Sequence, residues 1–311
     1  MKKQLSFLLL SSLVVLAGCT SESVVPTSAP QVNNQAEAQD VSLIISPYVV
    51  NTEAIASAKM SRAGSEAAKK TGLNVYSRLD VALIPVQRLT GDKVYSVHQE
   101  QAQESFGKMN FKVPVGKYHL VALANKAKTA LDIVSTENVP FPDKRATDIA
   151  YNFQEVNIDQ GGTVINAELE RSVAKFTLKS NDVRSSDVAT VKIRVEGNCS
   201  YVFNPTTGYA ADKQGNETTY DVAGNPNFAV MGSSYSFYTF LGSDDETVSI
   251  SVELLDKDGQ RLKKLEFSNV RLLRNKVTTY TGPLYSQSTE ASFTFSGTDE
   301  FETSGQDKTF D

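Results

Sequence analysis

Apolar and polar side chains alternate along most of the chain from residue 41 onward, and this period of two predicts β-strands. Val41, Leu43 and Ile45 share one face of a short segment that stops at Pro47. Residues 248–254 alternate strictly between aliphatic and polar side chains, with turn residues at 242–245 before them and at 256–259 after them. The same pattern predicts further strands at residues 78–86, 94–97, 106–115, 118–124, 163–169, 173–178, 189–195, 235–241, 262–267, 275–284 and 291–295.

About a dozen or more short strands with turns every 8–12 residues and hardly a helix are typical of an all-β fold. The length of 311 residues allows two domains. We therefore predict two tandem β-sandwich domains, at residues 41–170 and 171–311, with the hinge near Glu170-Arg171. Residues 51–70 are expected to form an exposed loop, and the irregular stretch at residues 125–150 leaves room for one short helix over Ala127–Val134.

The first 18 residues have the pattern of an export signal. Lys2 and Lys3 precede an apolar run over residues 5–17, which is shorter than the about 20 residues that span a bilayer. The run ends in Leu-Ala-Gly before Cys19, which resembles the lipobox of bacterial lipoproteins. We therefore predict a signal peptide at residues 1–18, lipidation of Cys19 with attachment to outer-membrane lipid, and a flexible tether at residues 19–40. The alternative is an ordinary secretory signal with a chance cysteine.

The charge balance argues against nucleic acid as a partner. The chain has 31 basic and 36 acidic side chains, a formal charge of −5. Removal of residues 1–18 takes away two lysines and no acid, which leaves 29 basic against 36 acidic side chains and a charge of −7. Such a chain lacks the clustered positive field on which nucleic-acid binding depends.

The residue types that carry most enzyme chemistry are scarce. His98 and His119 stand 21 residues apart and are not expected to form a ligand pair. Cys199 lies in a strand-like stretch and is expected to be a buried, inert thiol. The acidic turn at residues 244–246 could bind calcium, but a solvated hairpin tip is the preferred interpretation. We therefore predict a protein that is not an enzyme and has no cofactor and no metal. A secreted hydrolase ranks only third among the hypotheses, because no constellation of residues supports it.

Six segments, taken in order, resemble the fimbrillins of Bacteroidetes, the FimA- and FimB/Mfa2-like lipoprotein subunits of type V pili. They are Val-Ser-Leu-Ile-Ile at 41–45, Ser-Arg-Ala-Gly at 61–64, and residues 79–86, 113–125, 170–176 and 274–282. The resemblance implies two transthyretin-like β-sandwiches. It also implies proteolytic maturation between Arg62 and Ala63, which would release the lipidated segment; Lys59, Lys69 and Lys70 are competing exposed sites.

The function that the resemblance implies is that of a structural subunit of a cell-surface fimbria. The subunit would be exported as a lipoprotein precursor to the cell outer membrane and would polymerise by donor-strand exchange, supporting cell adhesion. Its partners would be other fimbrial subunits and a receptor on a host or bacterial surface.

The displaced strand would carry Val41, Leu43 and Ile45, and the donor strand would carry Ala291, Phe293 and Phe295. The alternative for residues 291–295 is that they close their own second sandwich. The alternatives for the whole chain are a membrane-retained anchor subunit that keeps Cys19, and a lipid-anchored surface binding module that does not polymerise.

Overall fold

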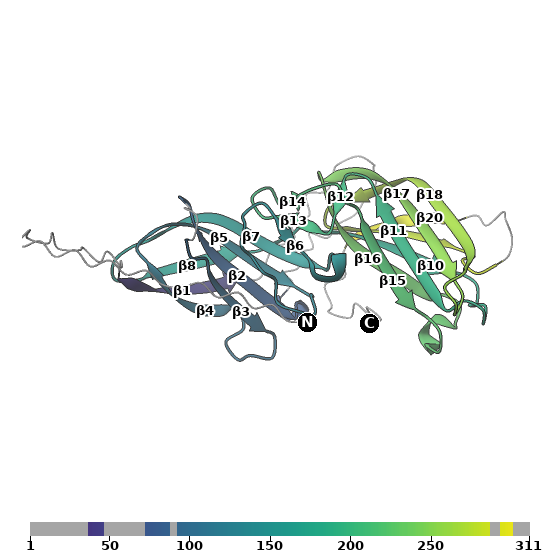
Figure 1. Cartoon of the computed structure of the whole chain (residues 1–311), viewed down its shortest axis with the longest axis horizontal. Helices are drawn as coiled ribbons and strands as arrows, with labels where there is room; N and C mark the ends of the chain where they lie inside the picture. Colours follow the sequence, from purple (N-terminus) through teal and green to yellow (C-terminus); the bar gives the residue numbers. More distant parts are fainter. Residues whose placement is uncertain (1–36, 47–71, 88–91, 287–292, 301–311) are drawn as a thin grey trace, which may run out of the picture. The chain divides into compact units, whose positions relative to one another are not determined.

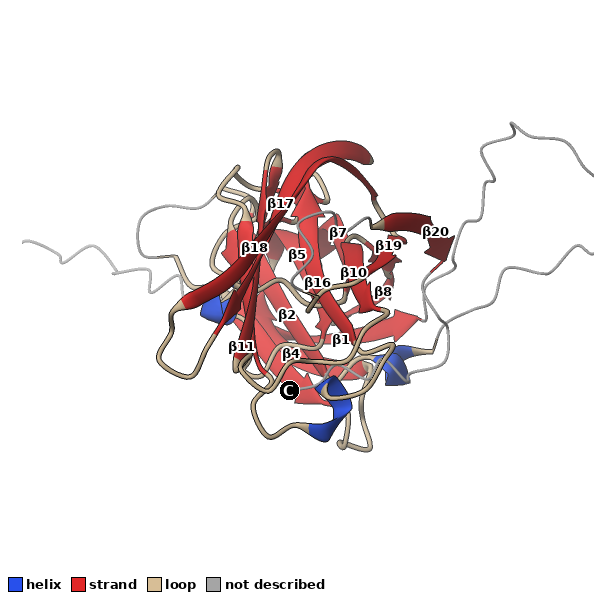
Figure 2. Ribbon diagram, turned by 90° about the vertical axis from the view of Figure 1, so that its right-hand side faces the viewer, coloured by secondary structure: helices blue, strands red, loops and turns tan. Residues whose placement is uncertain are grey.

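The computed structural model describes residues 37–46, 72–87, 92–286 and 293–300 (Figure 1). Within these ranges the chain is almost entirely β-strand and loop, as Figure 2 shows. The described helices are three single 3-10 turns: η1 (Leu73–Val75), η2 (Pro142–Lys144) and η3 (Pro226–Phe228). The all-β fold class that the alternating pattern predicts is confirmed.

Two sheets from the first half of the chain pack face to face, and we call them the first sheet pair. One has the order β4 (Lys108–Pro114), β1 (Ala38–Ser46), β8 (Thr163–Glu168). The other has the order β3 (Tyr95–Glu100), β2 (Arg78–Pro85), β5 (Gly116–Asn125), β7 (Ile149–Ile158), β9 (Glu170–Arg171). Alternate apolar side chains of both sheets fill the space between them, because successive residues of a strand point to opposite faces.

The second half of the chain forms the second sheet pair. One sheet has the order β12 (Cys199–Ser200), β16 (Ser234–Leu241), β10 (Ala174–Ser180), β19 (Lys276–Gly282), β20 (Thr294–Glu300). The other has the order β15 (Asn216–Asp221), β11 (Thr190–Glu196), β17 (Asp245–Leu255), β18 (Arg261–Leu273). A second apolar core lies between them.

A third core joins the two halves of the chain. Its frame is a small sheet in which β13 (Val202–Asn204) pairs with β14 (Tyr209–Ala210) on one side and with β6 (Val139–Pro140) on the other. Phe141, Phe203 and Phe240 lie in this core, and each is at most 2% exposed. The ring of Phe240 lies 5.0 Å from the ring of Phe141 and 5.0 Å from that of Phe203.

Two local expectations differ from the structure. No helix forms over Ala127–Val134; the segment is irregular, and Ala127, Leu131 and Ile133 are buried in the third core. The gain from burying these side chains at the junction outweighs the local helical preference. In addition, β1 begins at Ala38, three residues before the predicted start of the first domain at residue 41.

Candidate functional site

The strand that the sequence marks as displaceable, β1, occupies the middle of its sheet. It pairs antiparallel with β4, from Ala38 opposite Pro114 to Ile44 opposite Lys108. On its other edge it pairs parallel with β8, from Val41 opposite Thr163 to Ser46 opposite Glu168. We call the space between β4 and β8 the β1 slot. Without β1, both neighbours would present a row of unpaired backbone N–H and C=O groups.

The inward face of β1 is part of the first core. Val41, Leu43 and Ile45 are 0%, 1% and 5% exposed. The full burial of such side chains stabilises a fold by about 1.5–3 kcal/mol each, so the three together contribute on the order of 5–9 kcal/mol. The β1 slot is therefore an apolar groove whose floor is formed by the opposing sheet.

Both ends of β1 are fixed by hydrogen bonds to turns next to them. The Ile45 N–H donates to the Gly107 carbonyl at 2.8 Å, and the Gly161 N–H donates to the Gln39 side-chain oxygen at 3.0 Å. Gly162 has a φ of +98°, and a Cβ at this position would lie 3.0 Å from the Asp40 carbonyl oxygen. A side chain at residue 162 would therefore strain the turn that closes over the start of β1.

The outer face of β1 is polar and adds little stability. The Ser42 hydroxyl donates to the Asn110 side-chain oxygen at 3.0 Å. Lys112 and Asp40 form an ion pair of 3.0 Å, with both side chains at least 70% exposed. Exposed ion pairs of this kind contribute little, so β1 is held by its ladders and its inward side chains.

The structure places the C-terminal strand at the edge of its own sheet. β20 pairs antiparallel with β19, from Lys276 opposite Glu300 to Thr281 opposite Thr294, with a bulge between Thr279 and Tyr280. This arrangement is the alternative in which the segment closes its own sandwich. The strand lies at residues 294–300, later than the expected residues 291–295.

The two phenylalanines expected in the donor strand have different surroundings. Phe293 is half-buried against the second core, with its ring 5.0 Å from that of Phe267. Phe295 is 53% exposed, and its ring lies 5.7 Å from that of Tyr280. Ala291 lies outside the described residues. Because the Phe295 side chain is half exposed on an edge strand, its burial in this position contributes little stabilisation.

The backbone that leads toward β20 is held in place by two charged side chains that sequence reasoning missed. The Asp182 carboxylate accepts from the backbone N–H groups of Leu284, Tyr285 and Ser286 at 3.0, 2.9 and 2.8 Å. The Lys263 ammonium donates to the Ser286 carbonyl at 2.6 Å. No local motif marks either residue, because their partners lie 102 and 23 residues away in the sequence.

Three residues of the predicted maturation pathway lie outside the described residues: Cys19, Arg62 and Ala63. Lipidation of Cys19 and cleavage between Arg62 and Ala63 therefore stay predictions.

The histidines and Cys199, of the residue types that most often act in catalysis or bind metals, do not lie together in a common site. The His98 Nδ1–H donates to the buried Asp80 carboxylate at 2.7 Å, whereas the His119 ring stacks on Phe153. Cys199 is fully buried, and burial raises its pKa to about 11. At neutral pH its thiol is protonated and shielded from solvent. Within the described ranges no group of three or more His, Cys, Asp or Glu side chains could hold a metal ion.

The acidic turn is paired with arginines. Arg271 binds Asp245 through two nitrogens, with the shortest contact 2.6 Å, and these hydrogen bonds lower the pKa of Asp245. Arg274 lies 3.5 Å from Asp244 and 2.7 Å from Glu170. The acids of this hairpin tip are therefore occupied by arginines, and Arg274 links the tip to Glu170 of β9.

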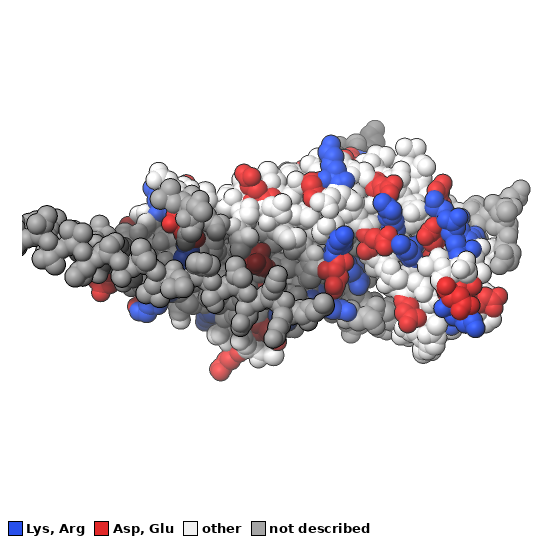
Figure 3. Space-filling model, viewed as in Figure 1, with Lys and Arg blue, Asp and Glu red and all other residues white. Residues whose placement is uncertain are grey.

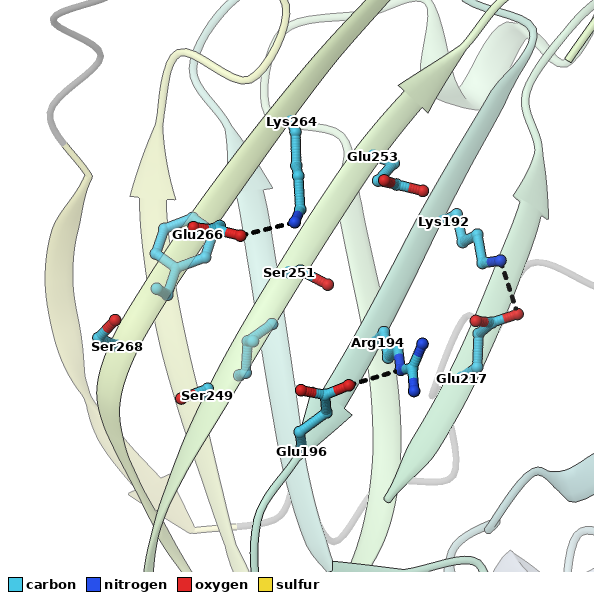
Figure 4. A pocket seen from close by; sticks show the side chains of 12 residues that line it. Lys192, Arg194, Glu196, Glu217, Ser249, Ser251, Glu253, Lys264, Glu266 and Ser268 are labelled. Carbon is cyan, nitrogen blue, oxygen red and sulfur yellow. Dashed lines mark ion pairs between the residues drawn. The ribbon is translucent and has the colours of Figure 1, made fainter. Parts of the chain in front are cut away.

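The outer face of β11, β17 and β18 carries a shallow cavity of about 330 Å³ (Figure 4). Six of its charged side chains pair with one another, in the ion pairs Lys192–Glu217, Arg194–Glu196 and Lys264–Glu266. The seventh, Glu253, pairs with Arg261 outside the cavity at 3.0 Å. Figure 3 shows the same alternation of both signs over this sheet pair. Because each cation already has a carboxylate, this face is a solvated sheet surface and offers no free charge to a ligand.

Comparison with protein-family models gives a match over residues 131–309 to a model described as "Family of unknown function (DUF6562)". No match was found among curated proteins. No described helix has the length and apolar character of a bilayer-spanning segment.

Several solved structures are similar to this chain. One is a Bacteroides ovatus protein described as a candidate adhesin, with a TM-score of 0.47, 12% identity, and coverage of 82% of this chain and 88% of that chain. Another is the fimbrial anchor protein Mfa2 from Porphyromonas gingivalis, with a TM-score of 0.41, 10% identity, and coverage of 83% and 95%. A third is the tip fimbrial protein Mfa3 from the same organism, with a TM-score of 0.36, 10% identity, and coverage of 84% and 100%.

The family model covers more than half of the 311 residues, and the chain therefore belongs to the family described as a family of unknown function, DUF6562.

Proposed function

We propose that this chain is a structural subunit of a cell-surface fimbria, exported as a lipoprotein precursor and polymerised by donor-strand exchange. The observation that carries the proposal is the central position of β1, whose inward side chains complete the first core while its ladders join β4 to β8. A strand in this position leaves a groove that only another strand of the same alternation can fill.

The predicted cleavage site that would allow β1 to leave follows β1 in the sequence. Arg62 and Ala63 lie between the end of β1 at Ser46 and the first turn, η1. Cleavage there would separate β1 from the rest of the chain covalently, so that only non-covalent contacts would retain it. The segment released would also carry Cys19, and the remaining subunit would lose its attachment to lipid.

The replacement strand would come from β20 of another copy. β20 is an edge strand, so its departure breaks one ladder, whereas insertion into the β1 slot forms two. Phe295 would pass from 53% exposure to burial, a change that favours the exchange.

The test compares Arg62→Ala with Lys59→Ala in the producing bacterium, using surface extracts run on SDS gels and N-terminal sequencing of the surface form. The wild type and Lys59→Ala are expected to give ladders of polymer and a surface form that begins at Ala63. Arg62→Ala is expected to give the uncleaved lipoprotein and no ladder. A normal ladder from Arg62→Ala would overturn the maturation step.

The position of β20 favours one second candidate, a membrane-retained anchor subunit. A chain whose C-terminal strand stays on its own sheet has no strand to donate, although its β1 slot could still accept one. An anchor would keep Cys19 on the mature surface form. N-terminal analysis of that form therefore separates the two roles, because it finds either lipidated Cys19 or free Ala63.

A further inference from the structure

A groove in the protein lies where the loops before β7 meet β15 and β16. It consists of two adjoining cavities of about 390 and 620 Å³, which share Lys128, Arg145 and Thr219 in their walls. Ala146 of the loop forms an isolated β-bridge with Tyr238 of β16, which fixes one wall against the other. We call this feature the junction groove.

The walls of the junction groove carry four cations and four carboxylates, in a chain whose overall charge is negative. Its carboxylates are Asp143, Asp148, Glu217 and Asp221, and its cations are Lys126, Lys128, Lys144 and Arg145. Two of the carboxylates are paired with cations that lie outside the groove, because Arg171 binds Asp148 at 2.9 Å and Lys192 binds Glu217 at 3.0 Å. Lys126 of the groove also lies 3.7 Å from Asp148. The balance that remains in the walls is three cations, Lys128, Lys144 and Arg145, against the two carboxylates of Asp143 and Asp221.

The three remaining cations of the groove are available to a ligand. Lys128, Lys144 and Arg145 form no ion pair with any residue that the structure describes. Lys128 and Lys144 are exposed, and Arg145 is half-buried. Arg145 lies close enough to Tyr220 for its charge to oppose the rise in the pKa of that buried phenol.

The turn that presents Lys144 and Arg145 is strained. Asp143 and Lys144 have φ values of +56° and +54°, in the left-handed region that side chains disfavour. Backbone strain of this kind is concentrated at binding and functional sites. The strained backbone of this turn is therefore consistent with a binding role for Lys144 and Arg145.

The strand register of the second sheet pair places the end of β20 in nearly the same cross-strand row as Tyr238, a wall residue of the groove. Glu300 lies opposite Lys276, and the next residue, Val277, lies opposite Lys175. Lys175 in turn lies opposite Tyr238, a wall residue of the groove. β20 and β16 are separated by two strands, which is a distance of roughly 15 Å at the usual strand spacing.

The sequence that follows β20 complements the groove in charge and in length. Residues 301–311 lie outside the described residues, and their sequence, Phe-Glu-Thr-Ser-Gly-Gln-Asp-Lys-Thr-Phe-Asp, has three carboxylates and one amine. Eleven residues span up to about 36–40 Å when extended, more than twice the distance to be crossed. We propose that the junction groove is a binding site for an acidic peptide, and that its occupant is residues 301–311 of the same chain.

Such binding would hold β20 on its own sheet, and it does not depend on whether the chain forms fimbriae. The carboxylates of Glu302 and Asp307 would pair with Lys144, Arg145 and Lys128, in a contact that weakens as salt is added.

The test uses the chain from residue 20 on and a fluorescein-labelled peptide of residues 301–311, with binding followed by anisotropy. The host is the full chain with Glu302→Gln, Asp307→Asn and Asp311→Asn, whose own segment can no longer compete. This host is expected to bind the peptide and to release it at ~0.5 M NaCl. The same host with Lys144→Glu and Arg145→Glu is expected to bind it about tenfold more weakly or worse.

Two controls make the result specific. Lys213→Glu with Lys257→Glu changes the net charge equally at exposed positions away from the groove and is expected to leave binding unchanged. The wild-type chain is expected to bind the peptide more weakly than the host does, because its own segment occupies the groove.

Four outcomes would overturn the inference. They are absence of peptide binding, equal binding by the groove variant, equal binding by the wild type and the host, and binding of polygalacturonate in place of the peptide. Concentration-dependent association of the wild type that Lys144→Glu and Arg145→Glu abolish would also overturn it, because the occupant would then be a second copy.

Discussion

At the scale of single residues, the direction of each β1 side chain decides what it contributes. Leu43 is 1% exposed and faces the first core, whereas its neighbour Ile44 is 39% exposed on the outer face. The two side chains have the same number of carbon atoms on one strand and differ in burial, so a comparison between them tests which face of β1 is inward.

We expect Leu43→Ala to lower the free energy of unfolding by about 2–5 kcal/mol, because it removes buried methyl groups and leaves a cavity. Ile44→Ala is expected to cost less than about 1 kcal/mol. Urea denaturation followed by circular dichroism measures both values. Equal costs for the two variants would contradict the placement of β1 in the core.

Burial also determines the behaviour of Cys199. Because its pKa is raised to about 11, the thiol is almost fully protonated at pH 8 and has no access to reagent. In the chain from residue 20 on, where Cys199 is the sole cysteine, we expect no reaction with a disulfide reagent in buffer and one equivalent in denaturant. Rapid labelling of the native protein at pH 8 would disprove the buried position.

At the scale of elements, strands with a regular alternation were predictable from sequence and those set by distant partners were not. Residues 248–254 alternate strictly, and β17 includes them with every second side chain buried. In β1 the same rule identified Val41, Leu43 and Ile45 as the inward face. These predictions succeed because a strand with one buried face requires apolar and polar residues to alternate along the sequence.

The elements that sequence reasoning misplaced depend on partners far away in the chain. Ala127 and Leu131 are spaced as on a helix, yet the third core holds them in an irregular segment. β20 starts at Thr294 because its register is set by β19 and by the bulge at Thr279, and neither can be read locally. The carboxylate of Asp182 was missed for the same reason, since it binds backbone 102 residues further on.

Deletion of residues 290–311 tests the role of β20 as an element. The loss of an edge strand removes one ladder and the contact of Phe293 with Phe267, so we expect a folded monomer with a modestly lower melting temperature. The deleted chain is expected to form no polymer alone but to accept a strand from intact subunits. Ladders formed by the deleted chain alone, or its complete unfolding, would contradict the assignment of β20 as donor strand.

At the scale of the whole described chain, the third core couples the two sheet pairs. Phe141 belongs to the first half of the chain and Phe240 to the second, and their rings are in contact. Buried contact between two units favours their unfolding in one cooperative transition. A single transition is therefore expected for the wild type by calorimetry.

Phe240→Ala should separate the two sheet pairs. It is expected to cost about 3–5 kcal/mol, because the side chain is fully buried, and to split the calorimetric peak into two. Phe295→Ala removes the same side chain from a half-exposed site and is expected to retain one peak with a small shift. A single, uniformly shifted peak for Phe240→Ala would show that the coupling lies elsewhere.

The ladders on both edges of β1 have a mechanical consequence. Tension along the length of a strand that is bonded on two sides loads all of its hydrogen bonds at once, so none can fail until many fail together. An edge strand such as β20 can instead be peeled from one end, one bond after another. Any strand that occupies the β1 slot therefore bears load in shear, and the rate at which it slips under tension is governed by the unfolding barrier of the first sheet pair.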